Sequence, residues 1–329
     1  MSTPEHLVSA PALTTRPLRF GADGVDPADL DTVVALAAAT DIALTGEAST
    51  GAGEVAWMLA LPTLDREATF LAHYGDEAVG FVFIEDDATA RDTFIDLAAP
   101  PGPWRRTVHE VGIAWGLEAA HQHRVRTPGE RTVRAGAWLQ DAELIADLGT
   151  QGLVPVRRFH HMRIESSSSA VPPVMLPLPD GVEIVVSDDE ATRRRICAVD
   201  NEAFADHWHF TPRDYDEWWS VWEAAPNRDP AGWWLLTVDG EDAGICLLDD
   251  GRAALGDGYV AILCVRRAFR GRGLAQLLLR RAFVHYRDLG REATQLGVDA
   301  ENLTGAVRLY EGVGMTAVQT RQGHALELE

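Results

Sequence analysis

Two glycines flanked by arginines form the segment of this chain best suited to binding an anion. Residues 270–275, Arg-Gly-Arg-Gly-Leu-Ala, lie between an apolar strand-like run at 259–265 and an amphipathic helical pattern that begins at Leu274. The glycines permit a tight turn that brings backbone N–H groups close to an anion, and the following helix adds the positive end of its dipole. Arginine side chains add charge-assisted contacts to phosphate oxygens. The segment therefore predicts a pyrophosphate-binding turn.

The surrounding residues exclude two common classes of phosphate-binding loop. A Walker A loop needs Gly-Lys-Ser/Thr at the start of the helix, where this chain has Gly-Leu-Ala at 273–275. A dinucleotide-binding fingerprint needs a third glycine at the position of Gln276, and it normally follows the first strand of a domain. Here the turn follows several strands. A basic strand-to-helix turn, with glycines required by backbone geometry alone, stays open as an alternative.

Downstream of the turn, the pattern alternates strand, helix and strand. Residues 296–299 predict a short strand, and the segment from Asn302 to Tyr310 predicts a helix with apolar side chains on one face. A glycine pair ends this helix before another strand at 315–318. By itself, Asn302 is also explained as a helix N-cap and Tyr310 as a core aromatic residue.

The sequence motif Arg-x-x-Gly-x-Ala at 270–275, preceded by Leu-Cys-Val at 263–265, resembles the acyl-CoA-binding motif of the GNAT (GCN5-related N-acetyltransferase) superfamily. Asn302, the pair Leu309-Tyr310 and the pair Gly314-Met315 follow in the order and spacing of that family. The resemblance implies that the turn holds the coenzyme A pyrophosphate. It also implies that the preceding strand splays from its neighbour and offers backbone groups to the pantetheine arm and the thioester carbonyl. The residues implied to bind acetyl-CoA are Leu263, Cys264, Val265, Arg270, Gly271, Arg272, Gly273, Leu274, Ala275 and Asn302.

The same resemblance places Tyr310 where the family keeps the general acid that protonates the departing thiolate. A phenol with a pKa of about 10 can protonate a thiolate with a pKa of about 8.5 only when hydrogen bonding couples the two. Many relatives carry a glutamate base at the position of Tyr259. Asp257 lies two residues earlier, so on an extended strand it projects from the same face and is the candidate base, acting through a water. Its alternative role is that of a turn residue between two glycines.

An aromatic and acidic segment at 200–210 supplies the predicted acceptor pocket. In the resembled fold, the first two helices and their connection cover this pocket. Aromatic residues of the segment can wall it, and acidic and imidazole groups can contact an amine. Phe204 and Trp208 lie four residues apart and also fit an ordinary helical core stripe. The predicted acceptor-binding residues are Glu202, Phe204, His207, Trp208 and Tyr259.

The chain contains two similar halves. A strand, an acidic turn and a second strand that contains a glycine occur in both halves, and this match aligns Gly80 with Gly244. A glycine-rich segment near the end of each half aligns Gly152 with Gly314, at nearly the same separation in the sequence. We therefore predict an α/β (α+β) protein of two tandem GNAT folds, each a mixed, mostly antiparallel twisted sheet flanked by helices. The predicted segments are a flexible N-terminus at 1–16, a first domain at 17–165, a linker at 166–180 and a catalytic second domain at 181–329.

The first copy lacks the residues that would bind a pyrophosphate. Arg106 and Val108 occupy the positions of the two loop glycines, and Glu110 adds a negative charge. No tyrosine stands near the counterpart of Tyr310. We therefore expect the first domain to be degenerate, with a structural role or a part in the substrate cleft.

The composition of the chain limits the classes of binding partner and the cellular locations that are expected. The 329 residues carry a formal net charge of −21, so nucleic acid is not an expected partner, whereas a cationic amine suits the acidic surface. Apolar runs end well before the ~20 residues of a membrane span, and no secretory pattern begins the chain, which predicts a cytoplasmic protein without membrane contact. The three cysteines are scattered, and the histidine pairs lack a third ligand at metal-binding spacing. No metal is therefore expected.

Two functions fit these patterns. The leading hypothesis is an N-acyltransferase that uses acetyl-CoA to acetylate a primary amine of a small molecule within a ternary complex, as a monomer or homodimer. The alternative is a catalytically inactive protein that binds coenzyme A as a sensor or scaffold. Tyr310 distinguishes them, because its phenol is needed for transfer and not for coenzyme binding.

Overall fold

The computed structural model describes residues 12–22, 24–205, 207, 210–225, 227–301 and 305–328. The first half contains β1 (Leu13–Pro17), β2 (Phe20–Gly21), β3 (Gly24–Val25), α1 (Pro27–Thr45), α2 (Ala52–Ala60), β4 (Phe70–Tyr74), β5 (Glu77–Asp87), β6 (Asp92–Ala98), α3 (Arg105–Arg126), β7 (Arg131–Trp138), α4 (Ala142–Thr150) and β8 (Val154–Glu165). The second half contains β9 (Val182–Val185), α5 (Glu190–Phe204), α6 (Tyr215–Glu223), β10 (Trp233–Val238), β11 (Glu241–Asp249), β12 (Asp257–Val265), α7 (Leu274–Asp288), β13 (Ala293–Asp299), α8 (Ala306–Gly312) and β14 (Thr316–Leu328), with short 3-10 helices at Pro230–Gly232, Ala253–Leu255 and Arg267–Phe269.

The order of elements repeats between the halves. Apart from the small β2–β3 hairpin and the 3-10 helices, each half runs strand, two helices, three strands, a long helix, a strand, a short helix and a final long strand. Every pair in the main sheet is antiparallel except β6 with β7 and β12 with β13, which are parallel. The predicted two-copy α/β fold with mixed, mostly antiparallel strands is therefore confirmed.

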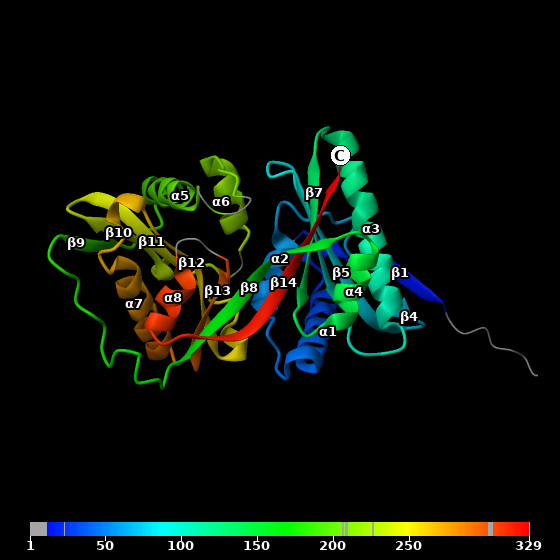
Figure 1. Cartoon of the computed structure of the whole chain (residues 1–329), viewed down its shortest axis with the longest axis horizontal. Helices are drawn as coiled ribbons and strands as arrows, with labels where there is room; N and C mark the ends of the chain where they lie inside the picture. Colours follow the sequence, from blue (N-terminus) through cyan, green and yellow to red (C-terminus); the bar gives the residue numbers. More distant parts are fainter. Residues whose placement is uncertain are drawn as a thin grey trace, which may run out of the picture.

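The halves exchange their final strands. The main sheet has 12 strands in the order β1-β4-β5-β6-β7-β14-β8-β13-β12-β11-β10-β9. Strand β8 of the first half pairs with β13 of the second, and β14 of the second pairs with β7 of the first. Figure 1 shows β8 and β14 side by side where the two lobes meet. Each lobe is thus completed by a strand from the other.

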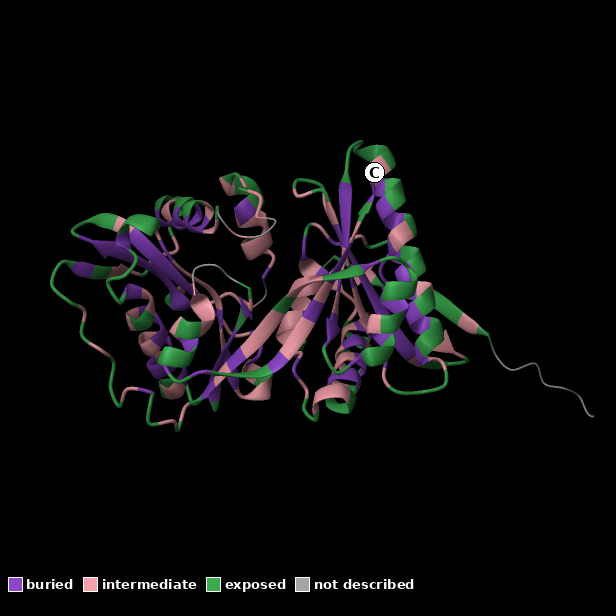
Figure 2. Ribbon diagram, viewed as in Figure 1, coloured by how far each residue is buried: buried purple, intermediate pink, exposed green. Residues whose placement is uncertain are grey.

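Helices cover both faces of the sheet in each lobe, and the buried residues gather between these layers (Figure 2). In the second lobe, apolar residues of α7 such as Leu278 and Phe283 pack in one core with Val260 of β12. A separate core on the opposite face joins Ile196 of α5 and Trp218 of α6 to β10 and β11. This arrangement fixes β12 between two helical layers, with opposite faces of the strand packed against different helices.

The parallel strands β12 and β13 separate along their length. They pair only where Asp257–Tyr259 lies beside 293–295, after which β12 continues to Val265 and β13 to Asp299 without pairing to each other. In the first lobe, β6 and β7 separate in the same way after Ile95 and Ala135. Each lobe therefore has a V-shaped opening in its sheet, as the resemblance implied for the second.

Ordered structure begins within the segment expected to be flexible, since β1 at Leu13–Pro17 pairs with β4. Residues 166–180 contain no helix or strand and connect β8 to β9. The exact domain limits at 17–165 and 181–329 stay predictions, and the exchanged strands mean that neither segment alone builds a whole lobe. Among the residues that the structure describes, no helix is long and apolar enough to cross a membrane.

Candidate active site

The predicted pyrophosphate turn lies open at the start of α7. Gly271 and Gly273 have φ angles of +77° and +74°, in the left-handed region that favours glycine, and no atom lies within 4 Å of a Cβ built at either position. Gly273 is the N-cap of α7. Backbone N–H groups at this helix start are therefore accessible to an anion.

The two loop arginines have different surroundings. Arg270 donates from Nε to the Val265 carbonyl at 3.0 Å and from Nη2 to the Ala203 carbonyl at 3.3 Å, so it ties the turn to β12 and α5. Arg272 is exposed, with its guanidinium 5.4 Å from the centre of the Phe269 ring. Arg270 thus has a clear role in shaping the turn, while Arg272 is the more available of the two for phosphate contact.

A cavity of about 820 Å³ extends from the turn into the opening between β12 and β13. Its walls include the predicted coenzyme-binding residues Leu263, Cys264, Val265, Arg270, Gly271, Gly273, Leu274 and Ala275. Arg272 does not line it, and Asn302 lies outside the described residues. We call this space the coenzyme cavity.

Tyr310 of α8 also lines the coenzyme cavity and is only 8% exposed. Burial raises the pKa of its phenol to about 12, and the nearby ionisable groups of Cys246, Tyr259 and Cys264 act in the same direction. The phenol is therefore protonated at neutral pH and can donate a hydrogen bond or a proton into the cavity.

A second cavity, of about 730 Å³, lies between the two lobes, and we call it the acceptor cleft. It shares Ala261 and Ile262 with the coenzyme cavity. These residues lie at a β-bulge, because Leu247 of β11 pairs with Ile262 while Leu248 pairs with Val260, leaving Ala261 as the extra residue. The two cavities thus meet at the irregular part of β12.

Asp257, the candidate base, is not brought into either cavity. Both of its carboxylate oxygens accept from Arg163 Nη1 at 2.8 Å, and Oδ2 also accepts from the Gln295 side chain. Burial raises the pKa of Asp257, and Arg163 opposes that change. Because Arg163 belongs to β8, this carboxylate joins the exchanged strand to the second lobe and lines no described cavity wall.

The other predicted acceptor residues are divided between different places. Tyr259 lines the acceptor cleft, whereas Phe204 and His207 line the coenzyme cavity. Glu202 forms an ion pair with Arg266 at 2.7 Å and lines neither cavity. Trp208 lies outside the described residues. Tyr259 is therefore the only described member of the predicted set that borders the cleft.

Comparison with known proteins supports this geometry. The Acetyltransferase (GNAT) family model matches residues 193–315, which include β12, the glycine turn and Tyr310. The mycothiol acetyltransferase of Propionibacterium freudenreichii subsp. shermanii is 30% identical over 275 residues, covering 78% of this chain and 76% of the relative. The mycothiol acetyltransferase of Mycobacterium marinum is 30% identical over 280 residues, covering 77% of this chain and 80% of the relative. The chain belongs to the GNAT acetyltransferase family.

Solved GNAT structures have the same architecture. A GCN5-related N-acetyltransferase from Sphaerobacter thermophilus matches with a TM-score of 0.76 and 26% identity, over 96% of this chain and 95% of that one. A tandem GNAT protein from the clavulanic acid biosynthesis pathway matches with a TM-score of 0.69 over 96% and 98% of the two chains, and at 16% identity it shows the fold alone. The two-copy GNAT architecture is confirmed, and the protein is a GNAT N-acetyltransferase.

Residues that sequence reasoning missed make up most of the acceptor cleft of this GNAT protein. Both lobes contribute aromatic walls, among them Trp57 and Trp222, whose ring centres lie 6.5 Å apart. The cleft contains more carboxylates than guanidinium groups. The acidic residues are Glu54, Glu85, Asp87, Asp92, Asp200 and Asp249, and the basic residues are Arg134, Arg213 and Arg252. Burial raises the pKa of Asp92 and that of Asp200 to about 6 each.

One of the missed residues had a detectable signal in the sequence. Asp249 ends β11 and pairs in register with Tyr259, the position where GNAT relatives carry an acidic residue. A hairpin alignment of the two strands would have placed it there. The residues from the first lobe had no such signal, because their proximity depends on how the lobes meet.

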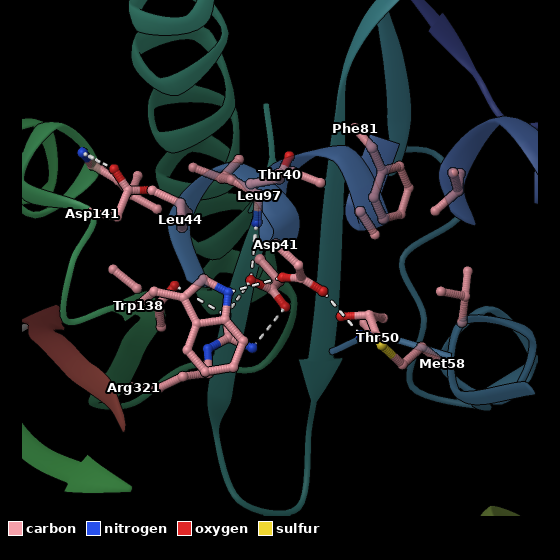
Figure 3. Close-up of a pocket in the computed structure, with 18 of the residues that line it drawn as sticks. Thr40, Asp41, Leu44, Thr50, Met58, Phe81, Leu97, Trp138, Asp141 and Arg321 are labelled. Atoms are coloured by element: carbon pink, nitrogen blue, oxygen red, sulfur yellow. Dashed lines mark hydrogen bonds and ion pairs between the residues drawn. The ribbon is translucent and has the colours of Figure 1, made fainter. Parts of the chain in front are cut away.

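The first lobe of this GNAT protein keeps the opening in its sheet and has a buried ion pair at the start of α3, the helix that corresponds to α7. Arg105, at the start of α3, is buried, forms an ion pair with Asp141 at 2.5 Å and donates to the Ala99 carbonyl. A cavity of about 80 Å³ remains in this lobe, with Asp141 in its wall, and Figure 3 shows Asp41 between Trp138 and Thr50 within it. The expected loss of a coenzyme-binding turn has a physical counterpart in this buried ion pair.

Proposed function

We propose that this GNAT protein transfers the acetyl group of acetyl-CoA to the primary amine of a small cationic molecule held in the acceptor cleft. The observation that carries the proposal is the meeting of the two cavities at Ala261 and Ile262. A thioester reaching these residues from the coenzyme cavity faces an amine approaching from the cleft. Direct attack within a ternary complex follows from that arrangement.

The coenzyme cavity has the shape and chemistry for acetyl-CoA, which supplies an activated acetyl thioester. The open turn at Gly271 and Gly273 and the start of α7 would hold the pyrophosphate, with Arg272 close by. The pantetheine arm would lie along 263–265, where β12 has no pairing to β13. A contact from Asn302 stays part of the proposal on the resemblance alone.

Two features of the site would stabilise the reacting groups. The bulge at Ala261 removes that residue from the ladder with β11, so a backbone N–H there can be directed at the thioester carbonyl. Tyr310 is buried, protonated and at the wall of the coenzyme cavity, so its phenol can give a proton to the leaving sulfur.

The charge of the cleft selects the acceptor. Six carboxylates and three guanidinium groups surround it, so the cleft has an excess of negative charge that favours an ammonium over an anion. The aromatic residues Trp57, Phe94 and Trp222 add apolar surface for the body of the substrate. We infer a small-molecule amine with an apolar or planar portion next to its ammonium group.

Coenzyme binding is tested first, by thermal shift with acetyl-CoA. Ligand at 100 times its Kd stabilises the folded protein by about 2.7 kcal/mol, so a rise in melting temperature is expected. Gly273→Asp should abolish the rise by adding strain and negative charge in the turn. Gly290→Asp is the matched control, because Gly290 has a similar φ of +77°, against +74° for Gly273, and open surroundings just beyond the far end of α7. Equal loss in both variants would contradict the assigned site.

Transfer is then tested by mass spectrometry of acetylated product. The amines are the unacetylated mycothiol precursor, glucosamine, kanamycin and tyramine. Acetylation of any of them, with release of coenzyme A, supports the proposal and shows whether the acceptor is shared with the mycothiol acetyltransferases. A protein that shows the thermal shift but acetylates none would favour the alternative of a coenzyme A-binding sensor or scaffold.

A further inference from the structure

One carboxylate of the acceptor cleft comes from the first lobe and is incompletely hydrogen-bonded. Glu54 lies in the first turn of α2 and borders both the cleft and the small first-lobe cavity. Its carboxylate accepts a hydrogen bond from the Gly51 backbone, but the buried Oε2 atom has no hydrogen-bond partner among the described residues. The Nη1 atom of Arg252 lies 3.6 Å from Oε2.

Three glycines hold Glu54 against the second lobe. A Cβ at Gly51 would lie 2.5 Å from the Gly251 carbonyl oxygen, and one at Gly53 would lie 2.8 Å from the Gly251 Cα. A Cβ at Gly251 would in turn lie 3.2 Å from the Glu54 nitrogen. Any larger residue would push α2 away from the turn that follows β11. This close approach, which we call the glycine seam, sets the position of Glu54 in the cleft.

The seam places Glu54 beside the family's base position. Tyr259 occupies that position and lines the acceptor cleft together with Glu54; burial, aided by the negative charges of Glu54 and Asp249, raises its pKa to about 12. Glu54 therefore lies close enough to β12 to influence a phenol at the bulge.

Other acidic residues of the second lobe are more fully engaged. Asp249 accepts from the Gly251 N–H at 2.7 Å, and Asp200 accepts from the Trp218 indole at 2.9 Å. Asp257 is held by Arg163 and lines neither cavity. Of these four carboxylates, only Glu54 has a buried oxygen without a hydrogen-bond partner among the described residues, and such an oxygen is able to accept a proton.

Asp92 is the closest competitor in the first lobe. It too has a buried oxygen, Oδ1, without a partner among the described residues, but Arg134 holds its other oxygen. Burial raises its pKa, and the charged groups that also act on it are Arg134 and Asp87 of the first lobe and Glu327, which lies where the exchanged strand β14 pairs with β7. Asp92 therefore lacks the link to β12 that Glu54 has.

We propose that Glu54 is the general base of acetyl transfer, contributed to the second-lobe site by the degenerate first lobe. This proposal rests on the proposed function. In the first step, the Glu54 carboxylate takes one proton from the substrate ammonium, directly or through one water. The carbon–nitrogen bond then forms and the carbon–sulfur bond breaks. Tyr310 gives its proton to the sulfur and regains one from the acylated nitrogen, while Glu54 releases its proton to solvent.

The environment of Glu54 predicts its effect on pH dependence. Burial raises its pKa, and Arg252, Arg321 and the Gly51 backbone oppose that rise while Asp41 adds to it. A base must be deprotonated, so kcat/KM should fall as the pH drops through a midpoint above the ordinary glutamate range. Glu54→Gln should remove this acidic limb.

A measurement without coenzyme separates catalysis from structure. Glu54→Gln keeps the shape and can still accept from the Gly51 N–H, but it removes a partly buried charge whose Oε2 atom is buried and unpartnered among the described residues. If Glu54 is held for catalysis, the variant should melt at a higher temperature than the wild type at pH 7, with the difference shrinking toward pH 4. A lower melting temperature at pH 7 would show that Glu54 is a structural partner of Arg252 and would overturn the proposal.

Kinetics complete the test, with the amine of the panel that the wild type acetylates best. Glu54→Gln should lower kcat/KM at pH 7 by about 100- to 10,000-fold and keep the thermal shift with acetyl-CoA. Asp92→Asn and Asp249→Asn, as matched controls, should retain the acidic limb. An active wild type with an equally active Glu54→Gln overturns the base assignment alone. A wild type that acetylates no amine overturns the proposed function and the base assignment with it.

Discussion

Replacing Tyr310 by phenylalanine removes one hydroxyl from the wall of the coenzyme cavity and leaves the ring in place. If the phenol protonates the leaving sulfur, kcat should fall by about 100- to 10,000-fold, the usual contribution of a positioned general acid. Coenzyme binding should survive, because the predicted pyrophosphate contacts lie in the turn at 270–275. The thermal shift with acetyl-CoA should therefore be nearly that of the wild type.

The burial of Tyr310 also sets the form of the pH profile. A pKa of about 12 in place of 10 means that the phenolate is disfavoured by about 2.7 kcal/mol relative to an exposed tyrosine. The acid form is therefore present throughout the range from pH 6 to 10. The wild-type kcat should show no basic limb from this group in that range, and the profile of Tyr310→Phe should have the same shape at a lower level.

The assay is steady-state formation of acetylated amine from pH 6 to 10, with Tyr74→Phe as a control. Tyr74 is a partly buried tyrosine of the first lobe whose ring stacks on Trp104, away from the coenzyme cavity. Tyr310→Phe activity within twofold of the wild type would refute the role of general acid. A wild-type basic limb near pH 8 to 9 that disappears in the variant would instead refute the argument from burial.

Three further perturbations test other parts of the fold. Burial alone would lower the pKa of His123, but contacts with Asp65 at 2.7 Å and Asp86 at 3.2 Å raise it to about 9. Urea unfolding should therefore show about 3 kcal/mol of stability that is present below pH 6.5 and lost as the pH rises through 9. The variant His123→Gln should not show this loss. Tyr286→Phe should lower the free energy of unfolding by about 2–4 kcal/mol in the same assay, because the hydroxyl accepts from the Asp249 N–H at 3.0 Å and donates to the Tyr259 carbonyl at 2.7 Å. An unchanged urea midpoint would contradict this prediction. Gly53→Ala should lower kcat by about 100-fold without loss of coenzyme binding, because the added methyl group forces α2 away from the glycine seam. The control Gly149→Ala should leave kcat unchanged, because the space around a Cβ at position 149 is open.

The geometry of the glycine turn was predictable because its determinants are local. A turn with two glycines requires left-handed backbone at fixed positions, and the observed φ angles of Gly271 and Gly273 meet that requirement. Tyr310 follows within one strand and one helix of the turn, so its placement in the same cavity needs only the βαβ arrangement of β12, α7 and β13. The opening between those strands comes from the same short segment.

The acceptor side was less predictable because it is built from distant parts of the chain. Strand alternation placed Asp257 and Tyr259 on one face, but it could not show that Arg163 of β8 would bind the aspartate. Local pattern likewise assigned Phe204 and His207 to the acceptor, while the fold places them at the coenzyme cavity. Both placements were beyond local pattern, since the exchange of β8 and β14 and the approach of α2 leave no periodic signal in the sequence.

The first lobe is better understood as part of the active site than as a second enzyme that lost its function. Its coenzyme entrance holds the buried Arg105–Asp141 pair, which a pyrophosphate would have to displace at the cost of an uncompensated buried charge. Yet its final strand carries His161 and Phe159 to the wall of the coenzyme cavity, and its second helix carries Glu54 to the acceptor cleft. These contributions do not require the first lobe to bind a coenzyme, because they depend on the exchanged strands and the glycine seam. Mutations in the first lobe should therefore alter turnover by the second wherever they move β8 or α2.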